Sequence, residues 1–270
     1  MEKELKDYDE KVKSYLNNCL SNPINDIEKT IIESCLRLTK LYSFSKTQTY
    51  PRPNHPLKSK QTNLYFTVIA ILISLRTTLE NETKATQAFI EKFKNIDEVI
   101  KSNINDIAEV IKCAGMPLKK AETILKASKY IKDNWNNDWN IFKNMNVNNT
   151  RNLLIKIPGF GEKAVDCLLV AGLEKTSIPV DVNVLRVVSR IFNFNWAENP
   201  DLGNKEQLKY VKDFLEKYLR KENFLYQIVH TLFLIHGKNT CNSKLNCSTC
   251  CLVDLCKYSK SNTNLPLFTF

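Results

Sequence analysis

The chain has 270 residues, 43% of them hydrophobic, and carries a formal net charge of +10 at pH 7. This length and composition suffice for one large core or two smaller ones, and the positive charge favours a polyanionic partner such as a nucleic acid. The longest apolar run, residues 68–73, is too short to cross a bilayer, so we expect no membrane-spanning segment.

The first part of the chain is predicted to form two amphipathic helices, over residues 2–20 and 24–42. A proline-rich connector at residues 50–56 follows, which no helix can cross. The first residues are charged and do not form a secretory segment, so we expect a reducing compartment.

Helical periodicity dominates the remainder of the chain, so the predicted fold is all-α, in two helical lobes with a cleft between them. We expect residues 61–175 to form a helical barrel. Residues 1–60 are expected to pack with the second lobe, which residues 176–270 form from C-terminal helices and a metal-binding loop.

A glycine-containing turn stands between two helical patterns, and its sequence over residues 157–163 is Ile-Pro-Gly-Phe-Gly-Glu-Lys. It holds two of the six glycines of the chain. A tight turn needs positive φ or close backbone approach, and glycine is the residue that permits both at low cost. Amide groups at the start of the second helix lack partners within that helix and bind phosphate readily. The pattern predicts a helix-hairpin-helix, although an ordinary αα-corner is the alternative. The predicted DNA contacts are Pro158, Gly159, Phe160 and Gly161.

Two ionisable residues near this turn are candidate catalytic groups. Lys163 lies in the first turn of the second helix, where the helix dipole disfavours the charged amine and favours Schiff-base chemistry. Asp181 follows 18 residues later, directly before an apolar helical pattern, where a carboxylate caps the helix and is held rigidly. The alternatives are a solvated surface lysine and an aspartate that acts as an N-cap alone.

Five of the nine cysteines fall within 16 residues, with the spacing Cys241-x5-Cys247-x2-Cys250-x5-Cys256 and Cys251 as an additional sulfur. Thiolates at such short separations indicate a metal, and the single Cys-x2-Cys hook favours a four-iron cluster over structural zinc. Disulfides are the remaining alternative. The other four cysteines lie in apolar helical patterns and are predicted core residues: Cys19, Cys35, Cys113 and Cys167.

Together, the hairpin with Lys163, the downstream Asp181 and the terminal four-cysteine loop resemble endonuclease III, of the helix-hairpin-helix DNA glycosylase superfamily. The resemblance covers roughly residues 63–258 and implies a six-helix barrel that carries the hairpin. It implies that Lys163 attacks the sugar C1′ of a damaged nucleotide with help from Asp181. It also implies a [4Fe-4S] cluster, whose ligands by motif position are Cys241, Cys247, Cys250 and Cys256.

The resemblance extends to residues that enter or touch DNA. Arg76 matches the family's gap-filling loop, Met116 matches its wedge loop, and Lys244, inside the first cysteine interval, would meet a phosphate. Arg76 stands where the bacterial type usually has glutamine, and Asn183 stands where it has histidine. The resemblance therefore implies the reaction class and leaves the base specificity open.

We expect a glycosylase that removes damaged bases, oxidised pyrimidines in particular, from double-stranded DNA and cleaves the abasic site through a lysine Schiff base. One alternative is a monofunctional mismatch or adenine glycosylase, in which Lys163 only contacts phosphate. Another is a non-catalytic DNA-binding module with structural zinc. We expect a monomer located in the cytoplasm at the nucleoid, or in the nucleus of a eukaryote.

Overall fold

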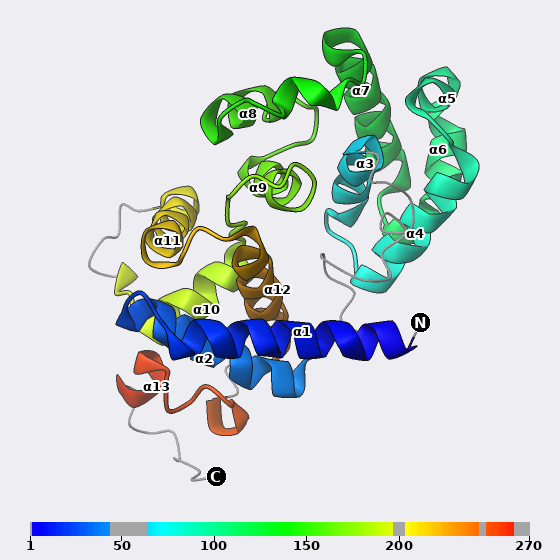
Figure 1. Ribbon diagram of the computed structural model, residues 1–270. Helices are drawn as coiled ribbons and strands as arrows, with labels where there is room; N and C mark the ends of the chain where they lie inside the picture. Colours follow the sequence, from blue (N-terminus) through cyan, green and yellow to red (C-terminus); the bar gives the residue numbers. More distant parts are fainter. Residues whose placement is uncertain (1, 44–63, 197–202, 243–246, 262–270) are drawn as a thin grey trace. The chain divides into compact units, whose positions relative to one another are not determined.

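The protein is described by a computed structural model (Figure 1). Its described residues form α-helices and short 3-10 helices without any β-strand among them, which confirms the predicted all-α fold. Within this part of the chain, no helix has the length and hydrophobicity that crossing a membrane requires. The structure describes residues 2–43, 64–196, 203–242 and 247–261.

The described residues divide into two compact units. We call residues 64–177 the hairpin unit. Residues 2–43, together with the described residues from 178 to 261, form the cysteine unit, so the N-terminal helices belong with the C-terminal ones.

The hairpin unit is built around α3 (Leu64–Ser74), where 8 of 11 residues are buried. A helix that is apolar on all sides needs neighbours on all sides, and α4, α7 and α9 pack against it (Figure 1). The other elements of this unit are α4 (Leu79–Lys92), α5 (Ile96–Lys101), α6 (Ile104–Val110), η1 (Lys112–Ala114), α7 (Pro117–Trp135), η2 (Trp139–Phe142), α8 (Val147–Leu154) and α9 (Glu162–Ala171).

Asparagine side chains begin several of these helices. Asn95, Asn103 and Asn146 each accept a hydrogen bond of 2.8–2.9 Å from the amide three residues later, at the starts of α5, α6 and α8. Asparagine is among the strongest N-cap residues. The cap at Asn146 starts α8, and the turn bonded from Ile157 N to Leu154 O (3.1 Å) follows the end of the helix at Leu154.

The cysteine unit is built around α12, which is buried along most of its length and packs against α10 and α2. The two N-terminal helices are α1 and α2, close to the predicted bounds, which confirms that part of the prediction. The elements are α1 (Glu2–Ser21), α2 (Asp26–Leu41), α10 (Val182–Phe192), α11 (Asn204–Tyr218), α12 (Asn223–Asn239), η4 (Cys247–Thr249) and α13 (Lys257–Ser261).

A buried ion pair joins the start of α2 to the α11–α12 connection. Both carboxylate oxygens of Glu28 accept hydrogen bonds from Arg220, at 2.9 Å from Nε and 2.8 Å from Nη2. Burial acts to raise the pKa of Glu28, but the hydrogen bonds from Arg220 and from the Ile24 amide outweigh it, so the pKa is lower than usual. The pair fixes the N-terminal helices within this unit.

The four cysteines predicted to lie in the core have different fates. Cys19 and Cys35 are buried, which confirms the prediction, whereas Cys167 is half-buried. For Cys113 the prediction is wrong, because the side chain is exposed. Helix α6 ends at Val110, and the 3-10 turn that follows directs the thiol outward, near Asn81 O (3.6 Å).

Candidate DNA-binding and catalytic site

The predicted helix-hairpin-helix is present, formed by α8, the turn at residues 155–161 and α9. Gly159 has φ +88°, which non-glycine residues rarely adopt. A Cβ atom at Gly159 would lie 2.4 Å from Thr123 Cγ2 and 2.9 Å from Leu72 Cδ2. The turn therefore packs backbone-first against α7 and α3, and only glycine fits there.

Phe160 was predicted among the DNA contacts, but its ring is 8% exposed and lies in the core of the hairpin unit. Its amide donates to Ile157 O (3.0 Å) within the turn. Phe160 therefore anchors the turn by packing. Pro158 beside it is half-buried, and both glycines of the turn are exposed.

The start of α9 carries the candidate nucleophile. Gly161 is the N-cap residue, with extended backbone (φ −114°, ψ 179°), and no side chain of the described residues caps the helix there. Adding a Cβ at Gly161 would meet no described atom within 4 Å. Lys163, the second residue of α9, is half-buried. No side-chain cap among the described residues therefore competes with an anion at the start of this helix, beside Lys163.

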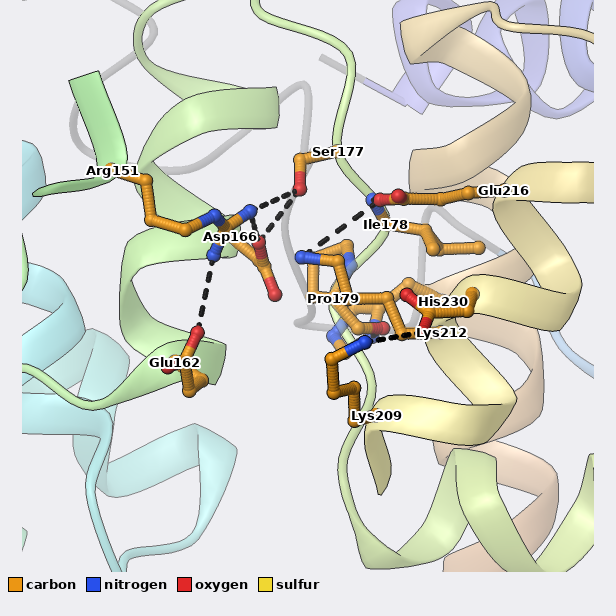
Figure 2. A network of polar contacts seen from close by, with 11 residues as sticks. Arg151, Glu162, Asp166, Ser177, Ile178, Pro179, Lys209, Lys212, Glu216 and His230 are labelled. Atoms are coloured by element: carbon orange, nitrogen blue, oxygen red, sulfur yellow. Dashed lines mark hydrogen bonds and ion pairs between the residues drawn. The ribbon is translucent and has the colours of Figure 1, made fainter. Parts of the chain in front are cut away.

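Figure 2 shows the polar network that holds the hairpin. Arg151 of α8 forms ion pairs with Glu162 and Asp166 of α9, and it also donates to Ser177 Oγ (2.8 Å). Ser177 Oγ donates in turn to Asp166 Oδ1 (2.7 Å). The Asp166 side chain is 3% exposed, so this network fixes α8 against α9 from within the unit. No local sequence signal pairs these residues, and our sequence analysis missed them.

Asp181 lies in the cysteine unit, at the start of α10. The backbone just before it is held by two hydrogen bonds, from Ile178 N to Glu216 Oε1 (3.2 Å, Figure 2) and from His230 Nδ1 to Pro179 O (2.8 Å). These two hydrogen bonds fix the backbone that leads into Asp181.

The carboxylate of Asp181 is bound at both oxygens. Its Oδ1 accepts from Asn183 N (2.9 Å) and Val184 N (3.0 Å), and its Oδ2 accepts from Asn183 Nδ2 (3.3 Å). Arg186 donates to Asn183 Oδ1 (3.3 Å) and to the Gly237 carbonyl (3.0 Å). A chain of hydrogen bonds thus runs from Asp181 to the end of α12, directly before the cysteine loop.

The four spaced cysteines line a single pocket in the cysteine unit, between α10, the end of α12 and α13. Apolar and polar side chains complete it, among them Val187, Arg190 and His236, and Cys251 is not among its lining residues. Burial raises the pKa of Cys250 to about 12, so the thiolate form is disfavoured without a cation. The lining cysteines are Cys241, Cys247, Cys250 and Cys256.

Polar groups surround these sulfurs. Arg190 Nη1 lies 3.2 Å from Cys241 Sγ, Leu252 N donates to Cys250 Sγ (3.4 Å), and His236 Nε2 lies 3.5 Å from the same sulfur. The described residues contain no group of three or more potential ligands close enough to hold one metal ion. In a four-iron cluster each cysteine binds a different iron, so its sulfurs lie further apart than around one ion.

Helix α2, in the N-terminal part of the chain, contacts the segment between α12 and α13 that carries the spaced cysteines. Arg37 donates to the Cys251 carbonyl (3.3 Å) and pairs with Asp254. Tyr42 Oη lies 3.1 Å from Thr240 Oγ1, next to the first cysteine. Helix α2 and its C-cap residue Tyr42 therefore support the loop. Lys244, predicted to meet a phosphate, lies outside the described residues.

Arg76 and Met116 lie in the hairpin unit, and both side chains are exposed. Each has positive φ, +53° for Arg76 and +49° for Met116. Two further large apolar side chains, Leu75 and Leu118, are exposed beside them in sequence. Our sequence analysis missed these two leucines, because apolar residues within helical patterns are predicted to be buried.

Comparison with known proteins gives the family. The model for "HhH-GPD superfamily base excision DNA repair protein" matches residues 69–213, which include the hairpin, Lys163 and Asp181. Endonuclease III of Sulfolobus acidocaldarius is 28% identical over 206 residues, 75% of this chain and 86% of that protein. Endonuclease III of Escherichia coli is 26% identical over 213 residues, 77% and 92% of the two chains.

Solved structures show the same fold. A trapped endonuclease III–DNA covalent intermediate aligns with a TM-score of 0.65 and 22% identity, covering 87% of this chain and 97% of that one. A thermostable thymine-DNA glycosylase aligns with a TM-score of 0.65 and 19% identity, covering 88% and 100%. The expected resemblance is confirmed, and the chain belongs to the HhH-GPD superfamily of base excision DNA repair proteins.

Proposed function

We propose that the protein is a bifunctional DNA glycosylase, which removes a damaged base from duplex DNA and then cleaves the strand as an abasic-site lyase. The observation that carries this proposal is the position of Lys163, half-buried in the first turn of α9 directly after the hairpin. The membership of the chain in the HhH-GPD superfamily supports base excision as the reaction class. The lysine supports the lyase step, because an amine nucleophile yields an imine.

The hairpin binds a phosphate of the DNA backbone. Gly161 leaves the first amides of α9 without a side-chain cap among the described residues, and Gly159 lets the turn sit close against the unit. The net charge of +10 adds long-range attraction for the polyanion. A phosphate contact does not depend on which base the nucleotide carries. The hairpin can therefore position Lys163 beside any damaged nucleotide.

The chemistry requires the damaged nucleotide to leave the stack. The Lys163 amine then forms a bond to C1′ as the glycosidic C1′–N bond breaks and the base departs with the electron pair. Asp181 stabilises the positive charge that develops on the sugar and takes a proton from Lys163. Opening of the sugar, with O4′ as the leaving group, gives the imine between Lys163 and C1′.

Strand cleavage follows from that imine. It acidifies the C2′–H bond, so a base removes the C2′ proton and the C3′–O bond breaks, with the 3′ phosphate as the leaving group. Water releases the sugar from Lys163. Asp181 suits both its tasks, because the hydrogen bonds at its two oxygens fix the orientation of the carboxylate.

The pocket of four cysteines fits a [4Fe-4S] cluster, with Cys241, Cys247, Cys250 and Cys256 as its ligands. When bound, the cluster holds the loop between α12 and α13 in shape, because ligand binding and folding of such loops are coupled. Lys244 of that loop then contacts a DNA phosphate. Base excision transfers no net electrons, so the role we propose for the cluster is structural.

Metal and sulfide analysis of anaerobically purified protein tests the cluster, with iron and sulfide expected and stoichiometric zinc contradicting it. Cys250→Ser should lose the cluster. Cys251→Ser is the matched control and should keep it, because Cys251 does not line the pocket.

For the substrate we propose oxidised pyrimidines, as the similarity to endonuclease III suggests. The experiment is borohydride trapping and base release on duplexes that carry an abasic site, an oxidised pyrimidine, 8-oxoguanine or a mismatch. We expect a covalent adduct with the abasic site and base release from the oxidised pyrimidine. Base release from a mismatch without any adduct would identify a monofunctional glycosylase, and binding without either reaction would identify a DNA-binding module.

A further inference from the structure

A buried lysine lies in the first turn of α7, between two loops of the hairpin unit. Lys120 is 6% exposed, and burial lowers the pKa of its amine. Its Nζ donates to Ile73 O (2.8 Å) and to Ala114 O (2.7 Å). Lysine is rarely buried unless its ammonium group is paired. Here two backbone carbonyls from different elements provide that pairing.

The two carbonyls precede the two residues expected to enter DNA. Ile73 belongs to the last turn of α3, whose terminal carbonyls lack partners within the helix, and Arg76 follows three residues later. Ala114 ends η1, and Met116 follows two residues later. The Lys120 amide also donates to Met116 O (3.1 Å). Lys120 therefore holds both loops close to the points where they leave α3 and η1.

Both loops adopt uncommon backbone conformations. Arg76 and Met116 have φ of +53° and +49°, and Gly115 between Ala114 and Met116 has φ +75° and ψ 150°, a region open essentially to glycine. Such conformations persist only where the surrounding structure holds them. The two hydrogen bonds from the Lys120 ammonium are a specific restraint of that kind.

We propose that Lys120 is a positioning residue, which fixes the two loops relative to one another so that Arg76 and Met116 enter the duplex together. The inference rests on the proposed function, because it assigns these side chains to the gap left by an extruded nucleotide. An apolar side chain such as Met116 fits between stacked bases, and the guanidinium of Arg76 hydrogen-bonds an unpaired base. The two tasks need a fixed separation, which flexible loops would not keep.

The exposed surface around the two loops agrees with this role. Leu75 is 39% exposed, Met116 42% and Leu118 55%, so three large apolar side chains next to the Lys120 anchor face solvent. Apolar wedges of this kind unstack base steps. The anchor itself touches no DNA in this scheme, so its effect passes through the loops.

The test compares Lys120→Met with two matched variants of the same helix. Ser128→Ala removes a buried hydrogen bond between α7 and α3, which joins Tyr65 Oη and Ser128 Oγ (2.7 Å), and controls for lost stability. Lys126→Met removes an exposed charge and controls for weaker electrostatic attraction. Each variant is measured on duplexes with 2-aminopurine opposite a tetrahydrofuran abasic analogue, whose fluorescence reports filling of the gap.

We expect Lys120→Met at saturating protein to lose most of the fluorescence change and to release an oxidised base about 100-fold more slowly, the scale of a displacement of about 1 Å. KM should change much less than kcat. Borohydride trapping on an abasic site, which has no base to extrude, should fall less than base release. Amide hydrogen exchange should accelerate at residues 74–77 and 113–116 in Lys120→Met and not in the two controls.

Equal effects of Lys120→Met and Ser128→Ala on fluorescence, base release and loop exchange would overturn the proposal. If Lys120→Met does not fold, Lys120→Gln, which still donates to one carbonyl, should show intermediate losses, and wild-type values in it would overturn the proposal. Wild-type protein that forms no adduct and releases no base would refute the proposed function instead. The exchange comparison would then still decide whether Lys120 anchors the loops.

Discussion

Two helix starts in this chain have nearly the same backbone and opposite chemistry. Gly161 before α9 has φ −114° and ψ 179°, and Asp181 before α10 has φ −117° and ψ 179°. At α10 the Asp181 carboxylate accepts the first amides of the helix, whereas Gly161 has no side chain to do so. The start of α9 therefore has no side-chain cap to compete with an external phosphate. At the start of α10 the amides donate to the Asp181 carboxylate and hold it in place.

The largest expected effect comes from changing the charge of the capped start while keeping its cap. Asp181→Asn should slow base release about 1,000-fold, equivalent to about 4 kcal/mol of lost transition-state stabilisation. Its free energy of unfolding should fall by no more than about 1 kcal/mol, because asparagine caps nearly as well. Single-turnover kinetics and denaturant unfolding measure the two quantities. Near-normal turnover would leave Asp181 with capping alone.

The turn before the open start should tolerate no side chain at its first glycine. Gly159→Ala should destabilise the hairpin unit by about 4 kcal/mol, because a Cβ would overlap Thr123 Cγ2 at 2.4 Å and the residue would have positive φ. Gly161→Ala is the matched control, since its Cβ would meet nothing within 4 Å. Denaturant unfolding of both variants checks the contrast, and equal stabilities would contradict this packing of the turn.

A third helix start adds sensitivity to acid. At α2, Asn25 Oδ1 accepts the Glu28 amide (2.8 Å), and Glu28 Oε2 accepts the Ile24 amide (2.8 Å). The pKa of Glu28 is lowered, so its contribution to stability is complete above the unfolded pKa of about 4.3 and is lost as pH falls through the folded pKa.

Glu28→Gln should therefore cost about 3 kcal/mol at pH 7, where Arg220 is left without its buried partner. The difference between wild type and variant should shrink below pH 4. Urea unfolding at pH 7, 5 and 3.5 measures it. A constant difference across this range would show that the ion pair is not its source.

The smallest of these effects comes from converting the open start into a capped one. Gly161→Asp should stabilise α9 by a few tenths of a kcal/mol. It should weaken DNA binding about tenfold and reduce the slope of log K against log salt by about 1, the value for one lost phosphate contact. Binding isotherms at several salt concentrations check this, with Gly161→Ala as the uncharged control. Unchanged affinity in Gly161→Asp would place the phosphate elsewhere.

Local signals made much of this molecule predictable. Helical periodicity gave the all-α fold, and the glycine turn and the aspartate before an apolar pattern located the hairpin and the cap of α10. Each of these features depends on a few consecutive residues. The burial of the Phe160 ring was not predicted, because a short turn does not reveal which of its side chains faces the core.

Features built from distant residues were not predictable. Arg151 meets Ser177 26 positions later, and Arg190 meets the Cys241 carbonyl 51 positions later, and neither residue carries a local sign of its partner. Lys120 reads as a surface residue, since its burial depends on two carbonyls that folding brings together. The prediction that Cys113 is buried was wrong for a different reason. The apolar helical pattern continues along the sequence, but α6 ends at Val110, before it reaches Cys113.

The central claim is that Lys163 forms the covalent intermediate, and borohydride trapping on abasic-site duplex DNA tests it most directly. Wild-type protein should form an adduct that peptide mapping assigns to Lys163, and Lys163→Ala should form none while still binding DNA. Lys156→Ala, which removes an exposed lysine of the same hairpin, should trap at the wild-type level. An adduct formed by Lys163→Ala at wild-type yield would contradict the account.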